Sequence, residues 1–149
     1  MRECEVVHAR GHENVSAEHV STFEVTTDDW LTPAGDCILA VDADRAPADF
    51  DASFVDACRN PDATITASVS VTEADGETHT ATITGRGHPD LSFENERSHV
   101  GRTSEYVDDR TVLVGADAAA ADLDRDLVEA LADGASVRFE LVVETDSAE

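Results

Sequence analysis

The segment Arg10-Gly11-His12-Glu13-Asn14-Val15-Ser16 recurs 76 residues later as Arg86-Gly87-His88-Pro89-Asp90-Leu91-Ser92. A second match joins residues 36–44 to residues 109–117 at an offset of 73, and it continues to the hydrophobic segments 69–71 and 141–143. This period is too long for a solenoid repeat. The chain is therefore predicted to be a tandem duplication of two units, about residues 4–72 and 80–144, joined by a hairpin turn at 73–77.

Each unit is predicted to fold as β-β-β-α-β. Alternating polar and apolar residues, and short segments rich in Ile, Leu and Val, indicate strands at residues 4–10, 19–26, 36–43, 63–72, 78–86, 93–101, 110–116 and 136–144. Asp51 and Asp124 are expected to be the N-caps of two short helices that end near Asn60-Pro61 and Asp133-Gly134.

The predicted fold class is α+β, with largely antiparallel sheets and pseudo-twofold symmetry. Residues 1–149 are expected to form a single domain built of the two repeats. Asp75-Gly76 predicts a tight hairpin between the units. Gly11 and Gly87, in the two Arg-Gly-His turns, are expected to adopt a positive φ.

The charge of the chain is strongly negative. The 149 residues include 33 acidic and 10 basic residues, every basic one is Arg, and the net charge is −23. Such self-repulsion is relieved by molar salt, which shortens the Debye length to about 3 Å. Because the acidic residues are spread along the chain, we favour adaptation to a high-salt cytoplasm over an acidic surface that mimics nucleic acid or binds a basic partner.

Composition also excludes classes of protein. No apolar segment approaches the roughly 20 residues of a membrane span, so no membrane contact is expected. The acidic composition argues against a basic surface that binds nucleic acid. Molar salt weakens this argument, because it screens the long-range attraction of phosphate for any protein. The chain has an odd number of cysteines, Cys4, Cys37 and Cys58, and no Cys-x-x-Cys pair. The first residues contain no apolar signal sequence. We therefore expect the protein in a reducing cytoplasm.

Several segments resemble an archaeal family known as domain of unknown function 371. They are Gly11-His12-x-Asn14-Val15-x-Ala17-x-His19, Thr22-x-Glu24-x-Thr26 and Leu31-Thr32-Pro33-x-Gly35-Asp36-Cys37-Ile38. Ala40 and Arg45 depart from the pattern, where Gly and Lys are expected. The resemblance implies an archaeal protein, here a haloarchaeal one, with a compact α+β fold, and it implies no activity.

Comparison of the two repeats separates shared polar residues from unshared ones. Residues found in both repeats are more often architectural, whereas His19, Cys37 and the loop at Thr32 occur in the first repeat only. A pseudo-symmetric site would use the same residue from both repeats, however, so the shared residues His12 and His88 are also candidates. The candidate polar residues of a cleft are His12, Asn14, His19, Thr32, Asp36, Cys37 and His88.

Two functions follow from these candidates. The first is a small cytosolic binding module, with a cleft between the repeats, for an unknown small molecule or protein. The alternative is a small metal- or Cys-dependent enzyme that uses His12, His19, Cys37 and His88. In that case the three histidines can ligate zinc and Cys37 needs a nearby base. The structural alternatives are that the histidines form hydrogen bonds to the backbone in turns and that Cys37 is a buried structural thiol. No cofactor is implied, because the chain contains no P-loop, dinucleotide loop or nucleophile elbow.

Overall fold

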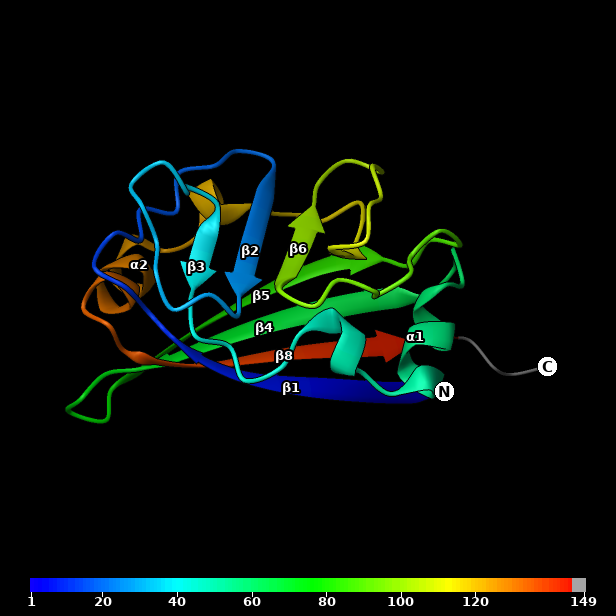
Figure 1. Cartoon of the computed structure of the whole chain (residues 1–149), viewed down its shortest axis with the longest axis horizontal. Helices are drawn as coiled ribbons and strands as arrows, with labels where there is room; N and C mark the ends of the chain where they lie inside the picture. The colour runs from blue at the N-terminus through cyan, green and yellow to red at the C-terminus, as the bar shows by residue number, and fades with distance from the viewer. Residues whose placement is uncertain (146–149) are drawn as a thin grey trace.

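Two four-stranded sheets stack on each other in the computed structural model, which describes residues 1–145 (Figure 1). The first sheet consists, in order, of β1 (Arg2–Arg10), β8 (Ser136–Glu144), β4 (Thr64–Thr72) and β5 (Thr78–Arg86). Every neighbouring pair in this sheet is antiparallel and in register over nine residues. Its inner face carries buried apolar residues such as Val7, Val69, Ile83 and Phe139, which explains why the sequence pattern located these strands well.

The second sheet is shorter. It consists, in order, of β3 (Ile38–Ala40), β2 (Thr22–Thr26), β6 (Ser98–Arg102) and β7 (Thr111–Leu113). The central pair, β2 and β6, is antiparallel, whereas the two outer pairs are parallel and each has a register shift. The predicted α+β class with largely antiparallel sheets is therefore confirmed, with two short parallel pairs in addition.

Two helices lie at opposite ends of the first sheet: α1 (Ala52–Cys58) and α2 (Arg125–Ala132) (Figure 1). Each follows a 3₁₀ turn that the sequence did not reveal, η1 (Pro47–Asp49) and η2 (Ala120–Asp122). Asp124 caps α2 as predicted, because its carboxylate accepts from the amide of Asp126. Asp51 occupies the N-cap of α1, but its carboxylate accepts from the Ser53 hydroxyl instead of a backbone amide.

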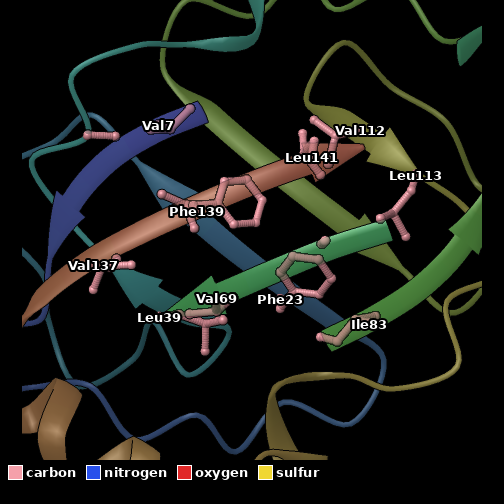
Figure 2. Packing of buried hydrophobic residues seen from close by; sticks show 14 of the residues in the cluster. Val7, Phe23, Leu39, Val69, Ile83, Val112, Leu113, Val137, Phe139 and Leu141 are labelled. Atoms are coloured by element: carbon pink, nitrogen blue, oxygen red, sulfur yellow. The ribbon is translucent and has the colours of Figure 1, made fainter. Parts of the chain in front are cut away.

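The core lies between the two sheets. Phe23 of β2 and Phe139 of β8 meet edge to face, with ring centroids 6.3 Å apart (Figure 2). Gly101 makes room for Phe23, because a Cβ on this glycine would lie 2.1 Å from the Phe23 Cε2 atom. The first helix adds Phe54 and the second adds Leu127, both buried. Aromatic and aliphatic side chains from both halves of the chain thus share one layer.

The expected positive φ at Gly11 and Gly87 is wrong. Neither residue has a positive φ. Both glycines are needed for close approach instead. A Cβ at Gly11 would lie 1.9 Å from the carbonyl oxygen of Leu131 in α2, and a Cβ at Gly87 would lie 2.2 Å from the carbonyl oxygen of Cys58 in α1. Each Arg-Gly-His turn therefore packs against the C-terminal end of a helix.

Four strands are shorter than predicted by three residues or more. The strands β2 and β6 begin at Thr22 and Ser98, three and five residues after their predicted starts. The side chains of His19 and Asn95 accept from backbone amides at these points, so the chain turns before each strand begins.

The strands β3 and β7 end earlier than predicted for a different reason. Asp42, shortly after β3, has a φ of 59°, and Gly115, shortly after β7, has a φ of 60°. This left-handed conformation cannot continue a strand. The predicted strand at 36–43 is therefore reduced to Ile38–Ala40, and the one at 110–116 to Thr111–Leu113.

The order of elements in the first half, β1-β2-β3-η1-α1-β4, is the same as in the second half, β5-β6-β7-η2-α2-β8. In the first sheet, strands from the two halves alternate. In the second sheet the halves lie side by side and meet where β2 pairs with β6. This junction places polar groups from both halves on the outer face of the second sheet.

Candidate functional site

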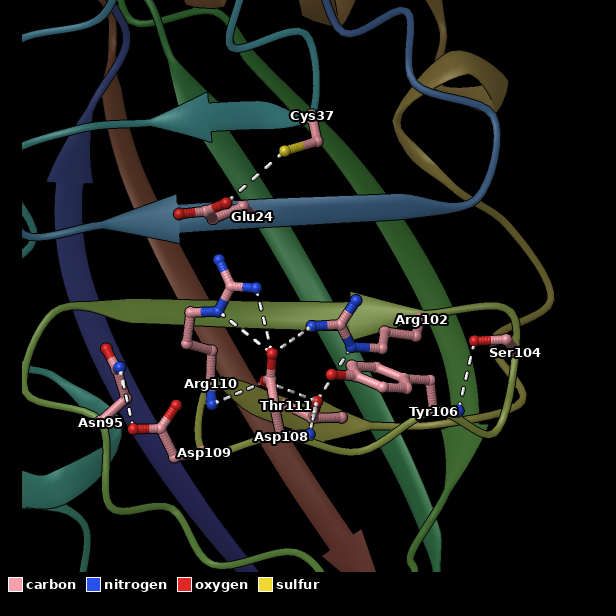
Figure 3. A network of polar contacts seen from close by, with 10 residues as sticks. All are labelled: Glu24, Cys37, Asn95, Arg102, Ser104, Tyr106, Asp108, Asp109, Arg110 and Thr111. Carbon is pink, nitrogen blue, oxygen red and sulfur yellow. Dashed lines mark hydrogen bonds and ion pairs between the residues drawn. The ribbon is translucent and has the colours of Figure 1, made fainter.

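A network of charged side chains lies beside β6 on the outer face of the second sheet (Figure 3). The Asp108 Oδ2 atom accepts from Arg102 Nη2 and from Arg110 Nη2, at 3.0 Å each. The other oxygen of Asp108 accepts from the Arg110 amide and the Thr111 hydroxyl, at 2.9 Å and 3.2 Å. One carboxylate thus fixes two guanidinium groups, which is a strong, charge-assisted arrangement.

The electrostatics of the network keep Asp108 ionised. Partial burial by itself would raise the pKa of Asp108, but hydrogen bonds from Arg110 and the charges of both arginines outweigh burial and lower this pKa to about 2. Arg102 also lies over the ring of Tyr106, 4.9 Å from its centroid. The Arg102 side chain is 11% exposed and that of Arg110 is 39% exposed, so Arg110 is the arginine that solvent and a ligand can reach.

Glu24 and Cys37 add groups from the first half of the chain. Glu24 lies between Phe23 and Val25 in β2, and because those two are buried in the core, Glu24 points to the outer face. The Arg110 guanidinium lies between Glu24 and Asp108 in Figure 3. The hydrogen bond to Asp108 raises the pKa of Arg110, and the charge of Glu24 adds to that effect. Both halves therefore contribute to one polar site.

The Cys37 thiol donates to Glu24 Oε1 at 3.5 Å. Burial, followed by the charge of Glu24, raises the pKa of Cys37 to about 11. The thiol is consequently protonated at neutral pH, whereas a nucleophilic cysteine needs a lowered pKa. Cys37 is half-buried and acts here as a hydrogen-bond donor, so the geometry gives no support to a Cys-dependent enzyme.

His19 lies three residues before the start of β2. Its Nδ1 atom accepts from the amides of Ser21 and Thr22 and lies 3.0 Å from the Thr22 hydroxyl. Asn95 has the same role before β6, because its side-chain oxygen accepts from the amides of Arg97 and Ser98 at 2.9 Å and 2.7 Å. The imidazole of His19 therefore holds a turn, and it does so beside the polar site.

The remaining first-half candidates lie in two loops that pack on each other. His12 Nδ1 accepts from the Asn14 amide at 3.0 Å, and the Asn14 side chain donates to the Leu31 carbonyl at 2.7 Å. The Thr32 carbonyl closes the turn at Gly35. The Asp36 carbonyl, from the strand-to-strand loop before Cys37, accepts from the amides of Glu18 and His19. These contacts link the 11–19 and 31–37 segments.

His88 lies far from this group. His12 follows β1 at the end of the first sheet where Arg10 pairs with Ser136, and His88 follows β5 at the end where Arg86 pairs with Thr64. Those ends are separated by the nine residues of β8, roughly 26 Å of strand. The structure therefore does not bring His88 to His12 and His19, either in a shared cleft or around a zinc ion. His88 Nδ1 instead accepts from the Asp90 amide, as His12 does from Asn14.

Two groups of residues were missed by reasoning from the sequence. The first is Arg102, Asp108 and Arg110, for which the substitution of Arg110 for Cys37 between the repeats was the available signal. The second is Glu73, Glu77 and His79, whose potential metal-ligand atoms all lie within 4.8 Å of one another. Two acidic residues flanking the predicted hairpin turn, with a histidine two residues further on, were the signal for this group.

In the part of the chain that the structure describes, no helix is long and apolar enough to cross a membrane. The sequence matches the family described as "Domain of unknown function (DUF371)" over residues 7–144. It is also 37% identical over 138 residues to the Uncharacterized protein MJ0206 of Methanocaldococcus jannaschii. That alignment covers 93% of this chain and 98% of the relative.

Proposed function

Because the chain belongs to the DUF371 family and carries a polar site built by both of its halves, we propose that it is a small cytosolic binding module for a small polar molecule. The site lies where β2 meets β6, on the outer face of the second sheet. The ligand chemistry proposed is a small zwitterion of the amino-acid type, with an anionic group toward Arg110 and a hydrogen-bond donor toward Glu24.

The proposal includes a duplication of two units, about 4–72 and 80–144, that form a single domain with pseudo-twofold symmetry. Local detail supports it beyond the order of elements. Ala17 and Phe93 are matching positions, and both have a positive φ. The amide of Gly11 donates to the Ala135 carbonyl, and the amide of Gly87 donates to the Ala63 carbonyl. Each half thus bonds to the other half at a matching point.

One observation carries the ligand proposal. Arg110 Nη1 and Glu24 Oε2 have no partner among the described residues, and they belong to side chains that face each other on the outer face. A guanidinium with a free N–H group binds carboxylate or phosphate with directional hydrogen bonds. A carboxylate with a free oxygen accepts from an ammonium or hydroxyl group. A ligand that carries both kinds of group satisfies both at once.

The charge of the chain makes this position distinctive. Arg102 and Arg110 lie together here beside the carboxylates of Glu24, Asp108 and Asp109, in a chain whose net charge is −23. An anionic ligand is repelled by most of the acidic surface and is repelled less where two guanidinium groups lie together. The proposed adaptation to a high-salt cytoplasm fits this picture, because molar salt screens the remaining long-range repulsion.

The test is a melting-temperature screen in molar KCl with three probes: amino acids, citrate and inorganic phosphate. A ligand at 100 times its Kd adds about 2.7 kcal/mol to stability, which is readily measured as a shift. We expect an amino acid to raise the melting temperature of the wild-type chain. Arg110→Gln should abolish the shift, and Arg138→Gln should keep it, because Arg138 is a half-exposed arginine paired with Glu140 on the first sheet.

Two results would refute the proposal. One is the absence of a shift with every probe. The other is an equal shift in the wild-type and Arg110→Gln chains, which would place binding elsewhere. A shift with phosphate or citrate alone would contradict the zwitterion class, because those probes offer no ammonium group to Glu24.

A further inference from the structure

A hollow of about 250 Å³ lies between the β4–β5 hairpin and helix α2, away from the polar site of the second sheet. Glu73, Glu77 and His79 line it from the hairpin, and Asp126, Glu129 and Asp133 line it from α2 and its C-terminal cap. No arginine lines the hollow. Its walls therefore combine five carboxylates with one imidazole, contributed by two separate elements.

The three hairpin residues converge because of strand geometry. Glu73 and Glu77 flank the turn, and the Glu73 amide donates to the Glu77 carbonyl at 2.8 Å. His79 follows two residues later, so its side chain leaves the strand on the same face as that of Glu77. That face is the inner one, because His79 pairs with Val71, which is fully buried. The hairpin extends this face past the core, to where α2 lies.

The three side chains lie close enough to bind one cation after small rotations. His79 Nε2 and Glu73 Oε2 are hydrogen-bonded at 2.8 Å, a contact that a bound cation would replace, and one ligand atom from each of the three residues lies within 4.8 Å of the others. Bonds of about 2.0–2.2 Å to a metal place neighbouring ligand atoms about 3–4 Å apart. Glu77 is exposed, so its side chain is free to rotate and close the remaining gap.

The start of β1, which corresponds to the start of β5, has hydrogen-bond donors that the hollow lacks. Glu3 occupies the position that corresponds to His79, and Glu5 follows it on the same face of β1. Glu5 forms an ion pair with Arg45 at 2.7 Å and accepts from the Asp51 amide, and Glu3 accepts from the Ser53 hydroxyl. Protein donors thus satisfy the carboxylates at that end.

Around the hollow, by contrast, His79 is the sole group that can carry a positive charge among the lining residues. The carboxylates of Glu77, Asp126, Glu129 and Asp133 accept no hydrogen bond and form no ion pair among residues 1–145. A bound cation would supply at this end the positive charge that Arg45 supplies at the other.

We propose that Glu73, Glu77 and His79 bind a divalent cation of the zinc class, with water completing its coordination. One imidazole nitrogen and two carboxylate oxygens form a mixed ligand set. Imidazole suits zinc and its neighbours, whereas magnesium and calcium take oxygen ligands almost exclusively. The acidic wall formed by Asp126, Glu129 and Asp133 adds attraction for a cation. This site is independent of the proposed ligand site on the second sheet.

The test is a calorimetric titration of the full chain with ZnCl₂ in molar KCl, which screens nonspecific attraction to the acidic surface. The titration uses a Cys4→Ser background, because the exposed Cys4 thiol is itself a zinc ligand. We expect one zinc ion per chain. The variants His79→Asn and Glu77→Gln should each lower the affinity at least roughly tenfold. The matched control is His88→Asn, a turn histidine at the opposite end of the first sheet.

Cobalt supplies a second readout, since bound Co²⁺ absorbs in the visible range and its spectrum reports a nitrogen ligand. We expect the spectrum to change on His79→Asn and to persist on His88→Asn. If His79→Asn folds poorly, Glu77→Gln decides the matter, because Glu77 is exposed at the turn. The absence of zinc binding, equal zinc affinity in the wild-type chain and either site variant, or magnesium binding as tight as zinc binding would each overturn the proposal.

Discussion

Acid sensitivity at His99 is the sharpest prediction of the structure. His99 lies in β6 and is fully buried, with its ring 5.3 Å from that of Phe50 and 5.7 Å from that of Phe139. Its Nε2 atom lies 2.8 Å from the Arg45 carbonyl, so Nε2 carries the proton of the neutral ring. Its Nδ1 atom has no partner among the described residues. A protonated ring would therefore place an unsatisfied charge in the core.

Burial is the main cause that lowers the pKa of His99 to about 4. An unfolded chain keeps this pKa near 6.5, so the unfolded state binds the proton more readily than the folded state. The free energy of unfolding therefore falls as the pH drops below 6.5, and the loss levels off below pH 4. Linkage gives a loss of about 2 kcal/mol between pH 7 and pH 5 from this residue alone, rising to about 3 kcal/mol at pH 4.

The measurement is urea unfolding at pH 7 and pH 5 in molar KCl, for the wild-type chain and for His99→Gln. Glutamine does not titrate and retains an N–H donor for the Arg45 carbonyl, so the variant should lose about 2 kcal/mol less between the two pH values. His8→Gln is the matched control, because His8 is exposed on β1. If His99→Gln and the wild-type chain lose the same stability between pH 7 and pH 5, the reasoning is wrong.

Three further outcomes follow from the fold and the charge. Gly11→Ala and Gly87→Ala should each destabilise the chain by about 2–3 kcal/mol, because the added Cβ meets the backbone carbonyl of a helix. Gly76→Ala should destabilise it by about 1 kcal/mol, because its φ of 91° is the single source of strain there. Equal losses of stability for the three variants in urea unfolding would contradict this. Removal of KCl should lower the melting temperature, and a chain equally stable in dilute buffer would refute the high-salt argument. Iodoacetamide at pH 8 should alkylate the exposed Cys4 far faster than the half-buried Cys37, whose pKa is raised to about 11; equal labelling of the two thiols, measured by mass spectrometry, would contradict the raised pKa of Cys37.

The long strands could be predicted from the sequence because apolar and polar residues alternate along them and so show which face is buried. The strand β4 buries every second residue over nine residues, and β8 does so with Val142 buried in addition, so the pattern fixes both their length and their faces. The strand β6 was placed less accurately. His99 is polar yet buried, and its burial depends on Phe50, which follows η1, and on Phe139 of the first sheet, which no local pattern reveals.

The candidate site was predicted in part. Cys37 was singled out from the sequence as an unshared residue, whereas its partner Glu24 lies on a neighbouring strand and Arg110 belongs to the other half, so neither could be joined to it from the sequence. His12 and His88 were candidates for a shared cleft because their segments match, with turn histidines as the alternative. The alternation of halves in the first sheet instead places them at opposite ends.

The sequence by itself determined the β-β-β-α-β order in each half, the α+β class and the acidic surface, because these depend on local periodicity and on composition. Only the tertiary structure decided which residues meet. Gly11 is required by the carbonyl of Leu131, about 120 residues away, and Arg110 faces Glu24 because β2 pairs with β6. Contacts of this kind depend on how strands from the two halves assemble into sheets. Packing of the shared core sets that assembly, and no single segment of sequence contains the information.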